Sequence, residues 1–241
     1  MPPTAAQQLQ IRGRTFLTEA PYEFADRVGR LGEGPIIDRY WHVQEGDVVF
    51  DVGAGHGLWT LPSCALGARV YAVEPNESSC VALERLLALN RFTSQCHIVQ
   101  VALSNRKGEH PAELRACAAP FFEGDPEITT LDALVKALKI PKVDWIKIDV
   151  EGGERCVIAG GLRTLMRYRP VVVIEDHTGV APFMYYCVPH DTRGKILATL
   201  KTLSYTVVDE PYSDRNFIVG WPSERVRFPP PDDPHAVAGT V

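Results

Sequence analysis

The feature that most constrains the fold of this chain is the regular alternation, from Asp47 onward, of short β-branched runs with helical patterns. Parallel strands need a crossover between them, usually a helix, so this order predicts an α/β fold with a doubly wound, mostly parallel sheet. Seven strands are expected, and the last two form a hairpin around the turn-rich PYSDR segment. The expected strands are 48–52, 70–73, 97–102, 145–150, 171–175, 205–209 and 216–221.

The expected helices lie between these strands and span 77–89, 130–138, 154–165 and 192–203. Asn76 can cap the first helix, and Thr130 or Asp132 can start the second. The third is loosened by Gly160 and Gly161, because glycine is a poor helix former. In such sheets ligands bind at the carboxyl ends of the strands, so those ends are the positions to search.

The chain of 241 residues divides by pattern into three parts. Residues 1–46 look mixed and partly helical, and we interpret them as an extension on the substrate side. Residues 47–221 carry the alternating pattern and form the main domain. Residues 222–241 hold five prolines and are expected to be an extended or disordered tail.

Composition excludes several classes of protein. Hydrophobic residues make up 45% and charged residues 23%, which is ordinary for a globular domain and excludes disorder over the whole length. A net charge of −5 gives no general attraction to nucleic acid or anionic lipid, and no run approaches the ~20 apolar residues of a spanning helix, so neither partner is expected. The start lacks an apolar secretory-signal region, so we expect a cytoplasmic protein with its six cysteines reduced.

The first strand ends in a glycine loop, Asp51-Val-Gly-Ala-Gly-His-Gly57, which allows a tight turn and close approach of a ligand to the backbone. The spacing departs from the GxGxxG of dinucleotide sites, which favours a nucleoside without a pyrophosphate. Glu74-Pro75 follow at the next strand end, and one carboxylate can accept hydrogen bonds from both ribose hydroxyls. The alternatives are an ordinary glycine-rich turn and a surface Glu74 that caps the following helix. Topology places Ala102, Leu103 and Ser104 where backbone groups can contact an adenine.

Acidic residues also follow two neighbouring strands further along. Asp149 and Glu151 end the 145–150 strand, and the next strand runs into Glu175-Asp176-His177. These side chains can serve as a general base, as metal ligands or as a group that orients a cationic ligand. The alternative is that the acids only cap the following helices. His177 is the natural proton acceptor near neutral pH.

Five segments resemble the FkbM-type methyltransferases: VVFDVGAGHG, VYAVEP, TLDAL, DWIKIDVEGGE and IEDH. The resemblance runs from about Gly46 to Trp221 and implies a class I, Rossmann-like sheet of seven strands whose last strand is antiparallel. It implies S-adenosyl-L-methionine as cofactor and a methyl-transfer site bordered by Asp149 and Glu151. Two departures are His56, where the family usually has Asn, and Pro62, which implies a first helix that starts late or kinks. The expected cofactor-binding residues are Asp51, Gly53, Ala54, Gly55, Glu74, Pro75, Ala102, Leu103, Ser104 and Asp149.

The sequence therefore predicts an S-adenosylmethionine-dependent O-methyltransferase that acts on a hydroxyl of a small molecule, sugar or natural product. Three alternatives stay open: carboxyl methylation of a small acid or peptide, an NAD-dependent oxidoreductase, and a non-catalytic nucleoside-binding adapter. In the main hypothesis His177 or Glu175 deprotonates the acceptor, which Asp149 orients. A second version adds Mg²⁺ held by Asp149, Glu175 and Asp176. The expected catalytic residues are Asp149, Glu151, Glu175 and His177, and residues 105–127 and the N-terminal region are expected to set acceptor preference.

Overall fold

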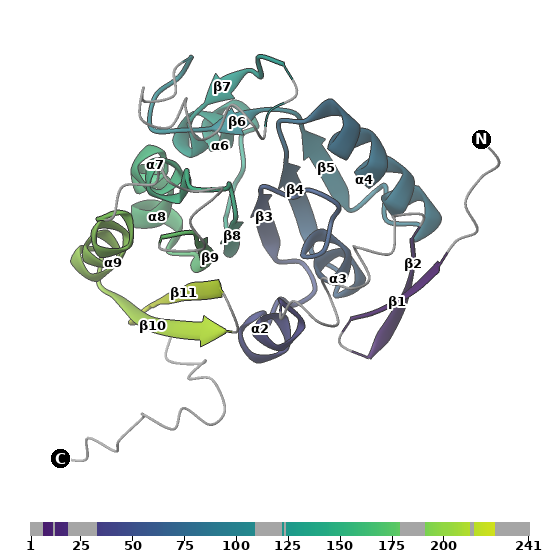
Figure 1. Ribbon diagram of the computed structural model, residues 1–241, viewed down its shortest axis with the longest axis horizontal. Helices are drawn as coiled ribbons and strands as arrows, with labels where there is room; N and C mark the ends of the chain where they lie inside the picture. Colours follow the sequence, from purple (N-terminus) through teal and green to yellow (C-terminus); the bar gives the residue numbers. More distant parts are fainter. Residues whose placement is uncertain are drawn as a thin grey trace.

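The computed structural model describes residues 7–11, 13–18, 33–108, 122, 124–178, 191–212 and 215–224. Its centre is a seven-stranded sheet in the order β10-β11-β9-β8-β3-β4-β5 (Figure 1). Neighbouring strands are parallel except around β11, which is antiparallel to both β9 and β10. The strands are β3 (Val48–Val52), β4 (Arg69–Val73), β5 (Cys96–Val99), β8 (Trp145–Ile148), β9 (Val171–Asp176), β10 (Tyr205–Tyr212) and β11 (Arg215–Pro222).

All seven expected strands form, which confirms the predicted α/β fold and its antiparallel last strand. Several strand boundaries differ from the prediction by a few residues, and one of these differences changes the topology. The strand expected at 97–102 ends at Val99, and the chain then forms β6 (Ala102–Leu103), which pairs with β7 (Ile128–Thr129) in a separate two-stranded sheet. The third strand end therefore carries its own small sheet.

Helices cover both faces of the large sheet (Figure 1). One apolar cluster joins alternate strand residues such as Val49 and Val173 to the first group of helices, and a second joins Phe50 and Val172 to the other group. This alternation follows from the two-residue period of a strand. The first group is α2 (Glu33–Tyr40), α3 (Thr60–Ala65) and α4 (Glu77–Leu89). The second is α6 (Leu131–Ala137), α7 (Glu154–Gly160), α8 (Leu162–Tyr168) and α9 (Thr192–Thr202).

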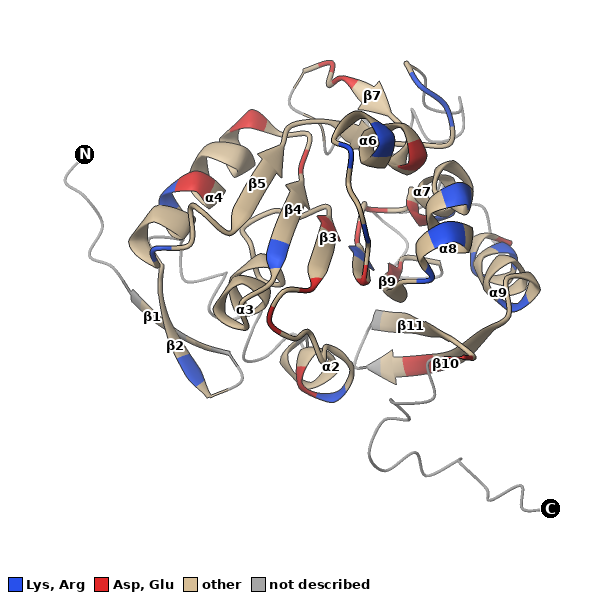
Figure 2. Ribbon diagram, turned by 180° about the vertical axis from the view of Figure 1, so that it is seen from behind, with Lys and Arg blue, Asp and Glu red and all other residues tan. Residues whose placement is uncertain are grey.

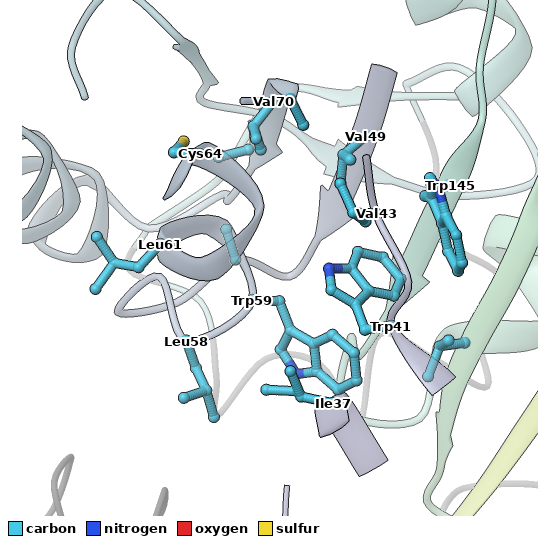
Figure 3. Close-up of a cluster of buried hydrophobic side chains, with 14 of the residues drawn as sticks. Ile37, Trp41, Val43, Val49, Leu58, Trp59, Leu61, Cys64, Val70 and Trp145 are labelled. Carbon is cyan, nitrogen blue, oxygen red and sulfur yellow. The ribbon is translucent and has the colours of Figure 1, made fainter. Parts of the chain in front are cut away.

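A tryptophan cluster anchors α2 and the segment after it to the sheet (Figure 3). The Trp41 ring meets Trp59 edge-on at 4.9 Å between centroids and lies 5.1 Å from Trp145. The indole N–H of Trp41 donates to Ser63 Oγ at 2.9 Å, so its polar atom is satisfied although the side chain is fully buried. The later part of the predicted N-terminal extension therefore packs into the core beside β3.

The rest of the described N-terminal region is a hairpin of β1 (Gln7–Ile11) and β2 (Arg14–Thr18). The Asn90 side chain at the end of α4 exchanges two hydrogen bonds with the backbone of Leu17, both at 2.8 Å. A mixed, partly helical region was expected, and its described residues form two strands and one helix. The described part of the proline-rich tail ends at residue 224, and most of 105–127 also lies outside the described residues.

Two predicted helix irregularities are present. Pro62 is the third residue of α3, where its missing N–H removes no intrahelical hydrogen bond, so the helix starts late at Thr60 as expected. The expected 154–165 helix divides into α7 and α8 at the glycine pair. A Cβ atom on Gly160 would lie 2.1 Å from the carbonyl oxygen of Ser104, so only glycine lets α7 approach this strand end.

Charged residues concentrate on the helices and loops, whereas the sheet is mostly uncharged (Figure 2). Lysine and arginine colour α6, α8 and α9, and acidic residues stand near several strand ends (Figure 2). Every helix among the described residues is too short or too polar to cross a bilayer.

Candidate active site

The glycine loop after β3 packs tightly on one side and is open on the other. Gly53 has φ +74°, and a Cβ atom there would lie 1.7 Å from the carbonyl oxygen of Asp149. Gly55 has φ +48°, and a Cβ atom there would meet nothing within 4 Å. The backbone at Gly55 is therefore accessible to a ligand, while Gly53 brings the β3 and β8 strand ends together.

Glu74, at the end of β4, is held beside this loop. Its Oε2 accepts a hydrogen bond from Gly55 N at 2.9 Å, and its Oε1 accepts one from Asn76 N at 3.0 Å. The side chain is 6% exposed, and burial raises the pKa of its carboxyl group although both backbone donors oppose the shift. Each oxygen keeps a lone pair for another donor, so Glu74 fits the predicted ribose contact. Because it is buried, it is not the surface glutamate of the alternative interpretation.

Asp51 lies on the other side of the loop, on the same sheet face as Lys147. The two are register partners in the parallel pair β3–β8. Lys147 Nζ donates to Gly53 O at 2.8 Å and lies 3.5 Å from Asp51 Oδ1 and 3.4 Å from Asp149 Oδ2. Burial raises the pKa of Asp51, and Lys147 and the hydroxyl of Thr60 (2.6 Å from Oδ2) oppose the shift.

Sequence reasoning missed Lys147. A signal existed, since it is the one charged residue in the otherwise apolar run Trp145–Ile148, and it is 4% exposed. A buried ammonium group needs nearby carboxylates, which Asp51 and Asp149 provide.

His177 gathers four carboxylates around its imidazole ring. Nδ1 is 2.8 Å from Glu154 Oε1. Nε2 lies 3.4 Å from Glu151 Oε2, 3.6 Å from Asp149 Oδ1 and 3.8 Å from Glu175 Oε1. Glu151 has φ +55°, a conformation that costs a non-glycine residue energy, and it brings this side chain into the cluster. The expected catalytic residues of both strand ends therefore meet.

The charge state of His177 follows from these neighbours. Burial opposes a charge on the ring, but Glu154, Asp149 and Glu175 outweigh it and raise the pKa of His177 to about 10. In this arrangement the ring is an imidazolium at neutral pH. This charge state opposes the predicted role of His177 as proton acceptor, because an imidazolium donates protons.

Glu154 is the second residue that sequence reasoning missed. It is 1% exposed, and its Oε1 accepts hydrogen bonds from Gly152 N at 2.9 Å and from His177 Nδ1. The sequence indicated it only as the first residue of the expected 154–165 helix. The tertiary contact with His177, 23 residues later, could not be read from that position.

Asp176 lies away from the cluster. Its Oδ2 pairs with Arg193 at 2.8 Å, and its Oδ1 accepts from Thr178 N at 3.0 Å. Successive residues of a strand point to opposite faces, so Glu175 and Asp176 cannot both face His177. The structure therefore does not bring together the expected Mg²⁺ set of Asp149, Glu175 and Asp176. Among the described residues it brings together Asp149, Glu151 and His177, whose ligand atoms lie within 4.8 Å of one another.

The expected adenine contacts are partly occupied by the protein itself. Ala102 N donates to Glu127 O and Ser104 N donates to Thr129 O, both at 2.8 Å. These two amide donors serve the small β6–β7 sheet. Contact through Leu103 and through the carbonyl groups stays a prediction, as do the contacts expected of Ala54 and Pro75. His56, where the family usually has Asn, is an exposed residue of the glycine loop.

Comparisons with known proteins agree with this architecture. Residues 51–206 match the family described as Methyltransferase FkbM domain. A relative from Haloferax volcanii, named hexuronic acid methyltransferase AglP, is 32% identical over 147 residues. This match covers 58% of the chain and 59% of the relative, so the chain spans less than two thirds of that protein.

Two solved structures show the same fold. An FkbM methyltransferase from Methylobacillus flagellatus KT has a TM-score of 0.57 at 13% identity, over 75% of this chain and 44% of that chain. A Streptococcus mutans methyltransferase in complex with SAH has a TM-score of 0.50 at 11% identity, over 74% of this chain and 90% of that chain. At these identities the likeness concerns the fold alone.

The strand order and the antiparallel β11 define a class I methyltransferase fold, with its candidate site at the strand ends. Within that class, the family match covers well over half of the sequence. The chain belongs to the FkbM methyltransferase family.

Proposed function

We propose that this protein is an S-adenosylmethionine-dependent O-methyltransferase whose acceptor is a sugar hydroxyl. The observation that carries the proposal is the junction of two half-sites at one edge of the sheet. Asp149 joins them, since its Oδ2 lies 3.4 Å from Lys147 on the glycine-loop side and its Oδ1 lies 3.6 Å from His177 on the acidic side. A donor and an acceptor can therefore meet at Asp149.

The glycine-loop half suits the cofactor. Glu74 can accept the ribose hydroxyls, and the open backbone at Gly55 leaves room for the ligand. Asp149, with its side chain 21% exposed, can accept a hydrogen bond from the amino group of the methionine part, while the buried Lys147 holds Asp51 and Asp149 in place. S-adenosylmethionine supplies an electrophilic methyl group on a positively charged sulfur.

The acidic half suits the acceptor. Asp149 and Glu151 are its more accessible members, with side chains 21% and 34% exposed. Either carboxylate can orient a sugar hydroxyl and take its proton as the oxygen–methyl bond forms. Glu175 is buried behind them at 3% exposure and adds negative charge. The proton acceptor in this proposal is therefore a carboxylate of Asp149 or Glu151.

A second candidate is methylation of a sugar carboxyl group. It is favoured by the name of the Haloferax volcanii relative, a hexuronic acid methyltransferase, because a hexuronic acid carries both hydroxyl groups and a carboxyl group. A carboxylate acceptor needs no deprotonation at neutral pH. The acidic cluster would repel it, which favours the hydroxyl product.

The test is an incubation of the protein with S-adenosylmethionine carrying a labelled methyl group and with glucuronic acid or its glycosides. We expect label in a product that survives mild alkali, because a methyl ether survives and a methyl ester is hydrolysed. Alkali-labile label would establish the carboxyl alternative. In parallel, calorimetry should show binding of S-adenosylhomocysteine. Binding of NADH instead would revive the oxidoreductase, and cofactor binding without turnover of any acceptor would favour the adapter.

A further inference from the structure

We propose that Asp149, Glu151 and His177 form a binding site for a first-row divalent metal ion, with Mn²⁺ as the ion used to test it. The inference rests on the proposed function only for the role of the ion, which would be to acidify the acceptor hydroxyl, with Asp149 and Glu151 holding the ion in place of taking the proton themselves. The existence of the site rests on the geometry of the three side chains and on the residue behind them.

The distances between the ligand atoms of the three side chains fit a shared metal ion. Charge-assisted hydrogen bonds between nitrogen and a carboxylate are ~2.7–2.9 Å long. His177 Nε2 stands back from Glu151 and Asp149 at 3.4 Å and 3.6 Å. Ligand atoms that each lie ~2.1 Å from one metal ion, at angles of 90–110°, are separated by roughly 3.0–3.4 Å. The three side chains are thus spaced as neighbouring ligands and need only small shifts to close on an ion.

The orientation of the His177 imidazole ring also fits a metal ligand. Glu154 Oε1 accepts from Nδ1 of His177 at 2.8 Å, and both side chains are buried. A carboxylate that binds the Nδ1–H of a histidine fixes the tautomer and directs the Nε2 lone pair outward, as is common behind metal-ligating histidines. Here Nε2 is directed at the oxygens of Glu151 and Asp149. Glu154 is therefore a positioning residue for the site.

The excess of carboxylates around His177 also favours a cation. Four carboxylates surround one imidazole, and the ammonium group of Lys147 faces the opposite oxygen of Asp149. At neutral pH the ring is an imidazolium, and its Nε2 lies 3.4 Å or more from three of these carboxylate oxygens. An ion that binds there takes the place of the Nε2 proton, which is released to solvent. A divalent cation between them satisfies the nitrogen and the oxygens together.

The donor set also selects among ions. Mg²⁺ and Ca²⁺ prefer oxygen ligands throughout, whereas imidazole suits first-row transition metals and carboxylates suit Mn²⁺. One nitrogen with two carboxylates therefore favours Mn²⁺ over the Mg²⁺ that the sequence suggested. Asp176 takes no part, since it is paired with Arg193.

The experiment is a titration of the whole chain with Mn²⁺, followed by electron paramagnetic resonance, in which the sharp spectrum of aqueous Mn²⁺ weakens as the ion binds. We expect saturable binding of one ion per chain. Glu151→Gln should weaken it at least about tenfold, and Glu154→Gln by about 10–100-fold through loss of ring positioning. Glu84→Gln, on the exposed surface of α4, is the matched control and should bind as the unaltered chain does.

Binding of S-adenosylhomocysteine is measured on the same samples. If the Mn²⁺ spectrum is unchanged by the protein, or if Glu151→Gln binds as Glu84→Gln does, the metal site is overturned. The proposed function then stands or falls separately on the S-adenosylhomocysteine heat. The Glu151 side chain is 34% exposed, whereas Glu154 is buried, so the Glu151 variant tests the site even if the Glu154 variant does not fold.

Discussion

The two halves of the candidate site treat their carboxylates differently. On the β3–β4 side each acid has neutral hydrogen-bond donors: Glu74 has two backbone N–H groups, and Asp51 has the hydroxyl of Thr60. On the β8–β9 side the acids converge on one imidazole, and three of its four carboxylate neighbours stand 3.4 Å or more from Nε2. The first half holds its acids with neutral hydrogen-bond donors and with Lys147, and the second half crowds four carboxylates around one ring.

This difference indicates what each half binds. Preformed hydrogen bonds to neutral donors hold a carboxylate in place for hydroxyl groups, which suits a nucleoside. Four carboxylates around one imidazolium leave an excess of negative charge, which suits a metal ion or an acceptor that gives up a proton. The variants described next test this difference between the two halves.

The largest effect is expected for Gly53→Ala, because Gly53 joins the two halves. The new Cβ would lie 1.7 Å from Asp149 O, so we expect unfolding free energy to fall by about 3 kcal/mol or more in urea denaturation. Gly46→Ala is the control. Gly46 has a similar φ of +79° but open space, so its loss should be only ~1–2 kcal/mol. If both variants lost the same stability, backbone strain at positive φ, and not the close contact between the strand ends, would explain why glycine is needed at position 53.

The next effect is on the cofactor half. Glu74→Ala removes the proposed ribose acceptor and should weaken S-adenosylhomocysteine about 10–100-fold in calorimetry, since hydrogen bonds to a charged group contribute ~1.5–3 kcal/mol. Mn²⁺ binding should change little, because Glu74 lies outside the acidic half. Glu84→Ala serves as control. Unchanged affinity in Glu74→Ala would remove the ribose assignment.

The pH dependence of cofactor binding should report the same carboxyl group. Burial raises the pKa of Glu74, and only its charged form can accept both ribose hydroxyls. Affinity for S-adenosylhomocysteine should therefore be highest above this raised pKa and should fall as the pH drops through it. Calorimetry at a series of pH values checks this, and in Glu74→Gln the decline should be much smaller.

The smallest effect separates two adjacent residues of β9. Asp176→Asn weakens the pair with Arg193 and should cost about 1 kcal/mol of stability, with methyl transfer and Mn²⁺ binding unchanged. Glu175→Gln should instead lower Mn²⁺ affinity and turnover, because Glu175 faces His177. Thermal unfolding and the two binding assays distinguish them. A loss of Mn²⁺ binding in Asp176→Asn would contradict the assignment of the two faces.

The sequence predicted the elements well because their signals are local. The β-branched runs marked all seven strands of the large sheet, and Gly160-Gly161 marked the division between α7 and α8. The strand expected at 97–102 was too long, because the pairing of β6 with β7 depends on residues more than 20 positions away. The sequence also indicated the N-terminal region only in part, since α2 is held by the burial of Ile36 and Ile37 in the core, which its short sequence does not reveal.

The residues of the candidate site likewise fall into those that the sequence indicated and those that it missed. Asp51, Gly53, Gly55 and Glu74 stand near one another in sequence on consecutive strand ends, and pattern alone indicated them. Lys147 and Glu154 were missed because their roles lie in contacts with Asp51 and His177 from other elements. Asp176 was included because a run of acids does not reveal which of them shares a face with the site.

By itself, the sequence determined the α/β architecture, and it predicted the edge of the sheet where a ligand is expected and the types of residue found there. These follow from hydrophobic period, turn-forming glycine and the rule that parallel strands end at one edge. Only the tertiary structure decided which acids act together. It placed Glu151 and Glu154 around His177, joined Asp149 to Lys147 and turned Asp176 toward Arg193. The reason is physical, because side-chain electrostatics depend on distances of a few ångströms between elements that the chain order leaves undetermined.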